Sequence, residues 1–259
     1  LSVLFVLIVL PFFFFSQTYK VHSHNDYEQN IPFWNALSAS VSSIEADVFL
    51  KNGQLYVAHE ENLISETRTL DDLYLIPMET ALEAGYISQP IQLLIDVKTD
   101  SRKTLEQIVL ELQKHPKLIR DNRIKWVISG NNPSVNEFKN YPDFIYFDYQ
   151  SLENLTAEQW KKVGLISRNF QEYSVWNGLG GIVAGELGKV KEVIAQAKSH
   201  GKPFRFWAIP DTKTSWEFFA HAGVDFINTD QPFECTSYLN SLDERTFQTP
   251  VFSTVYKPT

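Results

Sequence analysis

Residues 92–112 read QLLIDVKTDSRKTLEQIVLEL, and this stretch joins a strand pattern directly to a helix pattern. Its first part, Gln92–Val97, is almost continuously apolar, which is typical of a strand buried on both faces of a sheet. Apolar residues then recur at helical spacing from Leu105 to Leu112, and Asp100 or Ser101 stands where an N-cap is expected. The stretch therefore predicts a parallel strand followed by its crossover helix.

Strand and helix patterns alternate in the same way along most of the chain. Strands are expected at 19–22, 43–50, 92–97, 124–129, 144–147, 163–167, 204–209 and 225–228. Helices are expected at 32–41, 105–112, 187–197 and 214–222, with a further one starting at the capping box 156–159. About eight such units predict an α/β fold, a closed (β/α)8 TIM barrel. An open doubly wound sheet is the alternative, but no GxGxxG follows the first strand.

The two ends of the chain differ from this central part. Residues 1–15, LSVLFVLIVLPFFFF, carry no charge and are typical of the apolar part of a secretory signal peptide. Because the chain starts with Leu, we expect the beginning of that peptide to be missing. The expected organisation is a signal peptide at 1–17, a barrel at 18–240 and a C-terminal tail at 241–259. It predicts a secreted or periplasmic protein, associated with a membrane if the leader is uncleaved.

Charge and cysteine content narrow the classes of partner. The formal net charge is −8, so nucleic acid or anionic lipid would gain no general electrostatic attraction to this protein. A ligand that carries phosphate would instead need a local metal ion or a few placed cations. The single cysteine, Cys235, permits no intrachain disulfide, and we expect it to be a small, half-buried apolar residue.

Ionisable side chains gather at the ends of successive strands. Glu45 and Asp47 lie two residues apart on one strand, as do Asp96 and Lys98 on another, so each pair points to one side. In a barrel these strand ends meet at the mouth, where catalytic side chains lie. Converging carboxylates would repel one another unless a cation held them, and oxygen ligands suit Mg²⁺ or Ca²⁺. Taken singly, the pairs could also be a solvated edge and a plain ion pair.

Two histidines accompany these carboxylates. His24 follows the first strand, and His59 follows the return strand of a hairpin that turns at Asn52-Gly53. Because imidazole titrates near neutral pH, one ring can take a proton while the other gives one. We expect structural roles for the histidines at helix ends, which are His115, His200 and His221.

Several stretches resemble one superfamily in order along the chain. They are His24, IEADVFLKNGQLYVAHE at 44–60, LLIDVK at 93–98, FRFWAIP at 204–210 and GVDFINTDQP at 223–232. Together they resemble the phospholipase-C-like and glycerophosphodiester phosphodiesterase superfamily. HSHNDY at 22–27 and LLIDVKTD at 93–100 are similar to its branch of altered inheritance of mitochondria protein 6-like proteins.

The resemblance implies a (β/α)8 barrel with one divalent metal ion, Mg²⁺ or Ca²⁺, and two catalytic histidines. By position, the metal ligands would be Glu45, Asp47 and Asp96. The acid/base pair would be His24 and His59.

The same resemblance assigns the substrate contacts. Lys98 would contact the phosphate and Trp207 would wall the pocket, and we also expect Arg205 and Asn25 to meet the substrate. Two positions depart from the superfamily pattern. Asn25 stands where an arginine is usual, and Asp96 stands where a glutamate is usual. Both changes preserve the reaction class but leave a glycerol-type substrate in doubt.

These patterns predict a secreted metal-dependent phosphodiesterase that acts on a phosphodiester of a lipid head group or of glycerol or polyol type. The expected partner is a small phosphodiester or phospholipid-derived substrate bound by a monomer, with no nucleic acid and no stable membrane insertion after leader removal. Two alternatives are an amidohydrolase-like metal site on His22 and His24, and a non-catalytic barrel that binds a glycan or lipid head group.

Overall fold

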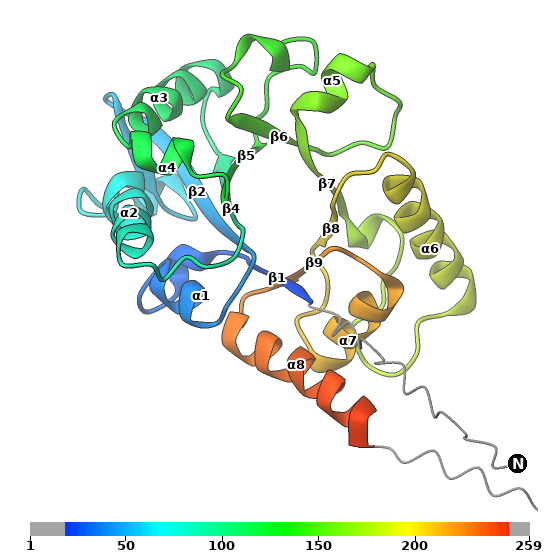
Figure 1. Ribbon diagram of the computed structural model, residues 1–259. Coiled ribbons are helices and arrows are strands. Elements are labelled where there is room, and N and C mark those ends of the chain that lie inside the picture. The colour runs from blue at the N-terminus through cyan, green and yellow to red at the C-terminus, as the bar shows by residue number, and fades with distance from the viewer. Residues whose placement is uncertain (1–18, 249–259) are drawn as a thin grey trace, which may run out of the picture.

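Eight parallel strands form the inner ring of the molecule (Figure 1). The computed structural model describes residues 19–248, with side chains described through residue 242, so the expected signal peptide lies outside the described residues. The strands of the ring are β1 (Lys20–Ser23), β2 (Ser43–Lys51), β4 (Ile91–Val97), β5 (Ile124–Gly130), β6 (Ile145–Tyr149), β7 (Val163–Asn169), β8 (Phe204–Trp207) and β9 (Phe226–Thr229). Because β1 pairs in parallel with both β2 and β9, the ring closes, which confirms the predicted barrel.

A ninth strand, β3 (Gln54–Val57), lies antiparallel to the end of β2. The turn between them has positive φ at Asn52 (52°) and at Gly53 (77°), as the predicted hairpin requires. This hairpin carries the chain back toward the barrel mouth, where His59 follows β3.

Helices surround the strands on the outside (Figure 1). They are α1 (Trp34–Ser38), α2 (Ile76–Glu83), α3 (Ser101–Gln113), α4 (Pro116–Arg120), α5 (Ala157–Lys162), α6 (Ala184–Ser199), α7 (Lys213–Ala222) and α8 (Pro232–Gln248). The predicted caps are present: the Asp100 side chain accepts from the Lys103 amide, and Thr156 forms a reciprocal capping box with Gln159. Within residues 19–248, none of the helices has both the length and the apolar character needed to cross a membrane.

The inside of the barrel contains an apolar layer between two polar ends. This layer is formed by Leu94, Val127, Leu165 and Phe226, which come from β4, β5, β7 and β9. Tyr146 packs against it from β6. A larger apolar cluster, which includes residues of every helix from α1 to α7, packs the outer faces of the strands against the helices.

The C-terminal boundary differs from the sequence expectation. Helix α8 continues through Gln248, so the expected start of a tail at residue 241 falls inside a helix. Cys235 and Leu239 are fully buried and Leu242 packs against the same core, which gives α8 an apolar face at i, i+4 and i+7. Cys235 belongs to this face as an ordinary apolar residue. The remainder of the expected tail lies outside the described residues.

Candidate active site

Three carboxylates converge at the mouth of the barrel. Glu45 and Asp47 project from β2, and Asp96 projects from β4 at the position paired with Asp47. One oxygen of each residue lies within 4.8 Å of the others. Glu45 is 4% exposed and Asp47 is 1% exposed. The structure thus brings together the three residues that the sequence predicted as a metal-binding set.

The charges of this triad are only partly compensated. Lys98 Nζ lies 3.0 Å from Asp47 Oδ2 and 2.8 Å from Asp96 Oδ2. Burial, followed by the charge of Glu45, raises the pKa of Asp47 to about 6 and also raises the pKa of Asp96. The Oδ1 atoms of both aspartates are buried without a hydrogen-bond partner. Unpartnered carboxylate oxygens at this spacing fit a hard divalent cation.

A glycine beside Asp96 is part of the same arrangement. Gly130 ends β5 with φ of +70°, and a Cβ atom there would lie 1.8 Å from Asp96 Oδ1. Any larger residue would therefore displace that carboxylate oxygen. Sequence reasoning missed Gly130, because its closeness to Asp96 arises only from the pairing of β4 with β5.

Two buried side chains, those of Arg205 and His22, hold the carboxylate of Glu45 in place. Arg205 Nη1 lies 2.8 Å from Glu45 Oε2, and His22 Nε2 lies 2.9 Å from the same oxygen. Burial alone would raise the pKa of Glu45, but the His22 hydrogen bond and the Arg205 charge outweigh it and hold the pKa well below its usual range. Arg205 is 4% exposed and also contacts Asn228. The structure therefore places Arg205 as a support for Glu45, which differs from the substrate contact expected from sequence.

His22 is buried beneath the mouth. Its Nδ1 lies 2.8 Å from Ser43 Oγ, and its Nε2 contacts the Arg205 guanidinium. Burial, followed by the charge of Arg205, lowers the pKa of His22 to about 3. A cation already faces Nε2, and the metal-capable cluster found among the described residues contains no histidine. This geometry counts against the amidohydrolase-like alternative.

His24 lies at the mouth with one ring nitrogen held by a carboxylate. Its Nδ1 is 2.7 Å from Asp230 Oδ1, and its Nε2 is 3.7 Å from Glu45 Oε1. Burial would lower the pKa of His24, but the Asp230 hydrogen bond and the charges of Glu45 and Asp230 raise it above its usual value. Asp230 directly follows β9, which pairs with β1. Its role as the partner of His24 was not predicted.

His59 lies on the other side of the triad, with its side chain 51% exposed. Its Nδ1 is 3.0 Å from the Tyr27 hydroxyl and 3.8 Å from Asp47 Oδ2. The Tyr27 hydroxyl also lies 2.8 Å from Asp47 Oδ2 and 2.7 Å from Asn25 Oδ1. Tyr27, which is 3% exposed, therefore connects His59 to Asp47, and Asn25 meets that hydroxyl from a left-handed backbone conformation with φ of 46°.

The far side of the mouth holds a second polar group. Asp148 is 1% exposed, and its Oδ2 accepts hydrogen bonds from Ser129 Oγ at 2.9 Å and Ser167 Oγ at 2.5 Å. Burial raises the pKa of Asp148 to about 6. Its Oδ1 has no hydrogen-bond partner.

An apolar hollow of about 610 Å³ adjoins the end of β8. Its lining includes Val175, Trp176, Ile209 and Pro210. Trp207, the last residue of β8, is partly exposed and directly precedes Ala208 in the lining of this hollow, and its expected contact with the substrate stays a prediction.

Comparison with known proteins supports the resemblance seen in the sequence. Residues 16–91 match the family of AIM6-like phosphodiesterase domains. The resemblance is confirmed. An altered inheritance of mitochondria protein 6 homolog of Arthroderma benhamiae is 42% identical over 139 residues, which are 44% of this chain and 43% of that protein. The Eremothecium gossypii protein of the same name is 26% identical over 270 residues, covering 82% of this chain and 67% of that protein.

Solved phosphodiesterases share the fold of this chain. A glycerophosphodiester phosphodiesterase from Parabacteroides distasonis has a TM-score of 0.57 at 16% identity, covering 87% of this chain and 98% of that one. An Oleispira antarctica phosphodiesterase in complex with sn-glycerol-3-phosphate also has a TM-score of 0.57, at 12% identity, covering 85% and 96%. A Ca²⁺-dependent phosphatidylinositol-specific phospholipase C from Streptomyces antibioticus has 0.53 at 12% identity, covering 86% and 95%.

Proposed function

We propose that this AIM6-like chain is a metal-dependent phosphodiesterase. The observation that carries the proposal is the triad of Glu45, Asp47 and Asp96, with two unpartnered carboxylate oxygens, lying between His24 and His59. The three carboxylates would hold one Mg²⁺ or Ca²⁺ ion. When bound, the ion supplies positive charge that neutralises a phosphate oxygen as negative charge develops on it.

We assign opposite proton-transfer roles to the two histidines. Asp230 holds His24 Nδ1 and the raised pKa of His24 favours its protonated form, which suits a general acid. Tyr27 has one hydroxyl proton, and the buried Asp47 carboxylate 2.8 Å away is its strongest acceptor. His59 Nδ1–H then donates to the Tyr27 oxygen, and in this tautomer the exposed Nε2 carries the lone pair that a general base requires.

The reaction follows from these assignments. His59 Nε2 takes the proton of the attacking hydroxyl, from water or a neighbouring substrate alcohol, and the oxygen forms a new bond to phosphorus. The bond between phosphorus and the leaving oxygen breaks, and His24 gives its proton to that oxygen. Lys98 uses two of its three N–H donors on Asp47 and Asp96, which leaves one for a phosphate oxygen.

The substrate class is proposed from the surroundings of the mouth. The apolar hollow lined by Trp176 and Ile209 suits a substrate with an apolar arm beside its phosphodiester, such as a phospholipid-derived one. A polyol head group would find hydrogen-bond partners at Ser129 and Asp148. The net charge of −8 argues against a nucleic acid substrate.

We propose a location for the protein from its sequence and an assembly state from the composition of its candidate site. The uncharged run at 1–15 supports export to the periplasm or the medium, and retention of that run would instead attach the protein to a membrane. We propose a monomer, because the candidate active site is built from residues of one chain.

The test is a panel of phosphodiesters, including glycerophosphocholine, a lysophospholipid and phosphatidylinositol, assayed with EDTA and then with Mg²⁺ or Ca²⁺ restored. We expect cleavage of at least one member that EDTA abolishes and the cation restores. Asp47→Asn should lose this cleavage, whereas Glu60→Gln, a matched change at an exposed neighbour of the mouth, should retain it. Binding without cleavage of any member would favour the non-catalytic alternative and overturn the proposal.

A further inference from the structure

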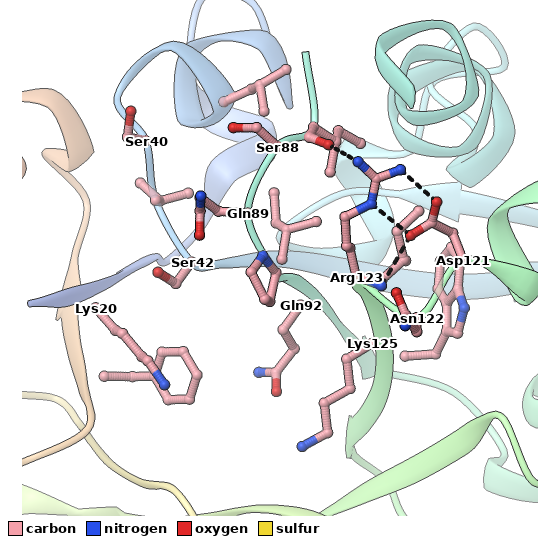
Figure 2. A pocket seen from close by; sticks show the side chains of 18 of the residues that line it. Lys20, Ser40, Ser42, Ser88, Gln89, Gln92, Asp121, Asn122, Arg123 and Lys125 are labelled. Atoms are coloured by element: carbon pink, nitrogen blue, oxygen red, sulfur yellow. Dashed lines mark hydrogen bonds and ion pairs between the residues drawn. The ribbon is translucent and has the colours of Figure 1, made fainter. Parts of the chain in front are cut away.

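A second cavity, of about 840 Å³, lies at the opposite end of the barrel from the carboxylates. It is lined by the first residues of strands, which include Lys20 of β1, Gln92 of β4, Lys125 of β5 and Phe226 of β9. Asp96 and Lys98, in contrast, lie at the end of β4 and just beyond it, and His24 and His59 follow β1 and β3. The apolar layer of Leu94, Val127, Leu165 and Phe226 separates the two ends. We call this cavity the base pocket (Figure 2).

The side chain of Lys125 lies in the base pocket next to Gly164, where no Cβ atom obstructs it. Its Nζ donates to the Gly164 carbonyl oxygen at 2.7 Å and lies 5.3 Å from the centre of the Tyr146 ring. A Cβ atom on Gly164 would lie 2.7 Å from Tyr146 Cβ and 3.1 Å from Lys125 Cε. Because residue 164 is a glycine, the Lys125 side chain has room to reach the carbonyl oxygen of that residue on β7. Two of the three N–H donors of Lys125 remain unused among the described contacts.

The positive charges in this region lack carboxylate partners. Lys20 Nζ lies over the Phe226 ring at 5.8 Å, and Lys202, just before β8, adds a further charge close enough to act on Lys125. No ion pair joins any of these three lysines to a carboxylate in the part of the chain whose side chains are described. Figure 2 shows the contrast: dashed lines join Arg123 to Asp121, whereas none leaves Lys20 or Lys125.

The electrostatic balance around Lys125 agrees with this geometry. Burial, followed by the charges of Lys202 and Lys20, lowers the pKa of Lys125 to about 8. The charges that act on this amine are those of other cations, in a protein whose net charge is −8. An anion placed among the lysines would remove this repulsion and restore the charged form of Lys125.

We propose that the base pocket binds the phosphate group of an anionic ligand, which Lys125 and Lys20 contact directly and Lys202 attracts. Gln92 lies opposite Lys125 in the sheet register, and its Nε2 donates to Ser43, which orients its side chain at the wall of the pocket. Aromatic residues at the wall, Tyr146 and Phe226, would pack against the organic part of such a ligand. This site is independent of the proposed catalysis, because no residue is shared with the mouth.

Calorimetry with inorganic pyrophosphate tests this site if binding at the mouth is suppressed. The full chain carrying Lys98→Met, kept in EDTA, serves as the background. We expect one saturable site in this background, and we expect Lys125→Met or Lys20→Met to weaken it roughly ten-fold, as loss of one charge-assisted contact would. Lys51→Met removes a charge from an exposed lysine of the β2–β3 hairpin and should leave the affinity unchanged.

A second assay separates a soluble ligand from a lipid head group. Sedimentation with phosphatidylcholine vesicles is compared with and without phosphatidic acid. Pyrophosphate binding that needs Lys125 without vesicle binding supports a soluble phosphate compound, and sedimentation that needs both Lys125 and phosphatidic acid supports a lipid head group. Because Lys20 is exposed, its variant should fold, and a thermal unfolding scan checks this. No saturable binding in either assay, or binding by the Lys20 and Lys125 variants as tight as that of the background protein, would overturn the proposal.

Discussion

The two ends of the barrel carry opposite kinds of charge on the same strands. Strand β1 presents Lys20 at the base and His22 in the middle, and His24 follows it at the mouth. At the mouth, the carboxylates outnumber their cationic partners, and the Oδ1 atoms of Asp47, Asp96 and Asp148 have no hydrogen-bond partner. At the base, Lys20, Lys125 and Lys202 form no ion pair with a carboxylate among the residues whose side chains are described, and Asp121 pairs with Arg123. We therefore propose a cation at the mouth and an anion at the base, and the apolar layer separates the two sites.

The difference also shows how a strand specifies two sites at once. Because side chains alternate, every second residue of a strand points into the barrel, first at the base and finally at the mouth. Lys125 and Ser129 of β5 have the same parity and serve opposite ends. Changes at the mouth should affect catalysis and leave the base pocket intact, and changes at the base should do the reverse.

The largest expected effect is on turnover at the mouth. His24→Ala and His59→Ala should each lower kcat by about 10²–10⁴, because each removes one proton transfer. His221→Ala, a change at an exposed helical histidine, is the matched control and should leave kcat near normal. Near-normal kcat in both mouth variants, measured on a phosphodiester that the protein cleaves, would contradict the assignment of catalysis to the mouth.

The second-largest expected effect is a loss of stability when Arg205 is replaced. Arg205→Met leaves Glu45 buried without its main cationic partner, and we expect unfolding to become easier by about 3–5 kcal/mol. Urea denaturation measures this change. Arg102→Met removes an exposed arginine that pairs with Glu137 and should cost less than about 1 kcal/mol. Equal losses in the two variants would contradict the support role of Arg205.

Asp148 should give the mouth a distinct pH dependence of stability. Its pKa in the folded protein is about 6, above the ordinary 3.8, so the folded state binds more protons than the unfolded state between these values. The contribution of Asp148 to the free energy of unfolding therefore falls as pH rises through this window, by on the order of 2–3 kcal/mol. Asp148→Asn should remove that decline. Identical pH profiles of urea unfolding for the two proteins would rule out this burial effect.

The smallest effect is expected at Tyr27. Tyr27→Phe keeps the buried ring but removes the hydroxyl that joins His59 to Asp47, and kcat should fall about ten-fold. Tyr86→Phe, at an exposed tyrosine, is the matched control. If Tyr27→Phe left both kcat and its pH profile unchanged, the hydroxyl would have no part in fixing His59.

The barrel and the triad could be predicted from the sequence because residues two apart on a strand point to the same side, which is a short-range pattern. Glu45 and Asp47, or Asp96 and Lys98, reveal their shared direction within three residues. Partnerships across the barrel carry no such local signal: Asp230 meets His24 across 206 positions of sequence. Only closure of the ring by β1 and β9 brings them together.

Arg205 shows a second limit of sequence reasoning. Its place on a late strand predicted a substrate contact, but depth within the barrel cannot be read from alternation alone. Arg205, which is buried beneath the triad, and Trp207 at the mouth are only two positions apart. Helix α8 shows a different limit, because the apolar spacing of Cys235, Leu239 and Leu242 became evident only from their packing on the core.

The most direct test of the central claim is the location of a bound cation. Crystals of the full chain grown with Mn²⁺ and a non-hydrolysable phosphodiester analogue would show the ion by its anomalous scattering. We expect one ion held by the carboxylates of Glu45, Asp47 and Asp96, with the phosphate group of the analogue between His24 and His59. An ion on His22 and His24, or no ion at the triad while the analogue is bound, would contradict this account.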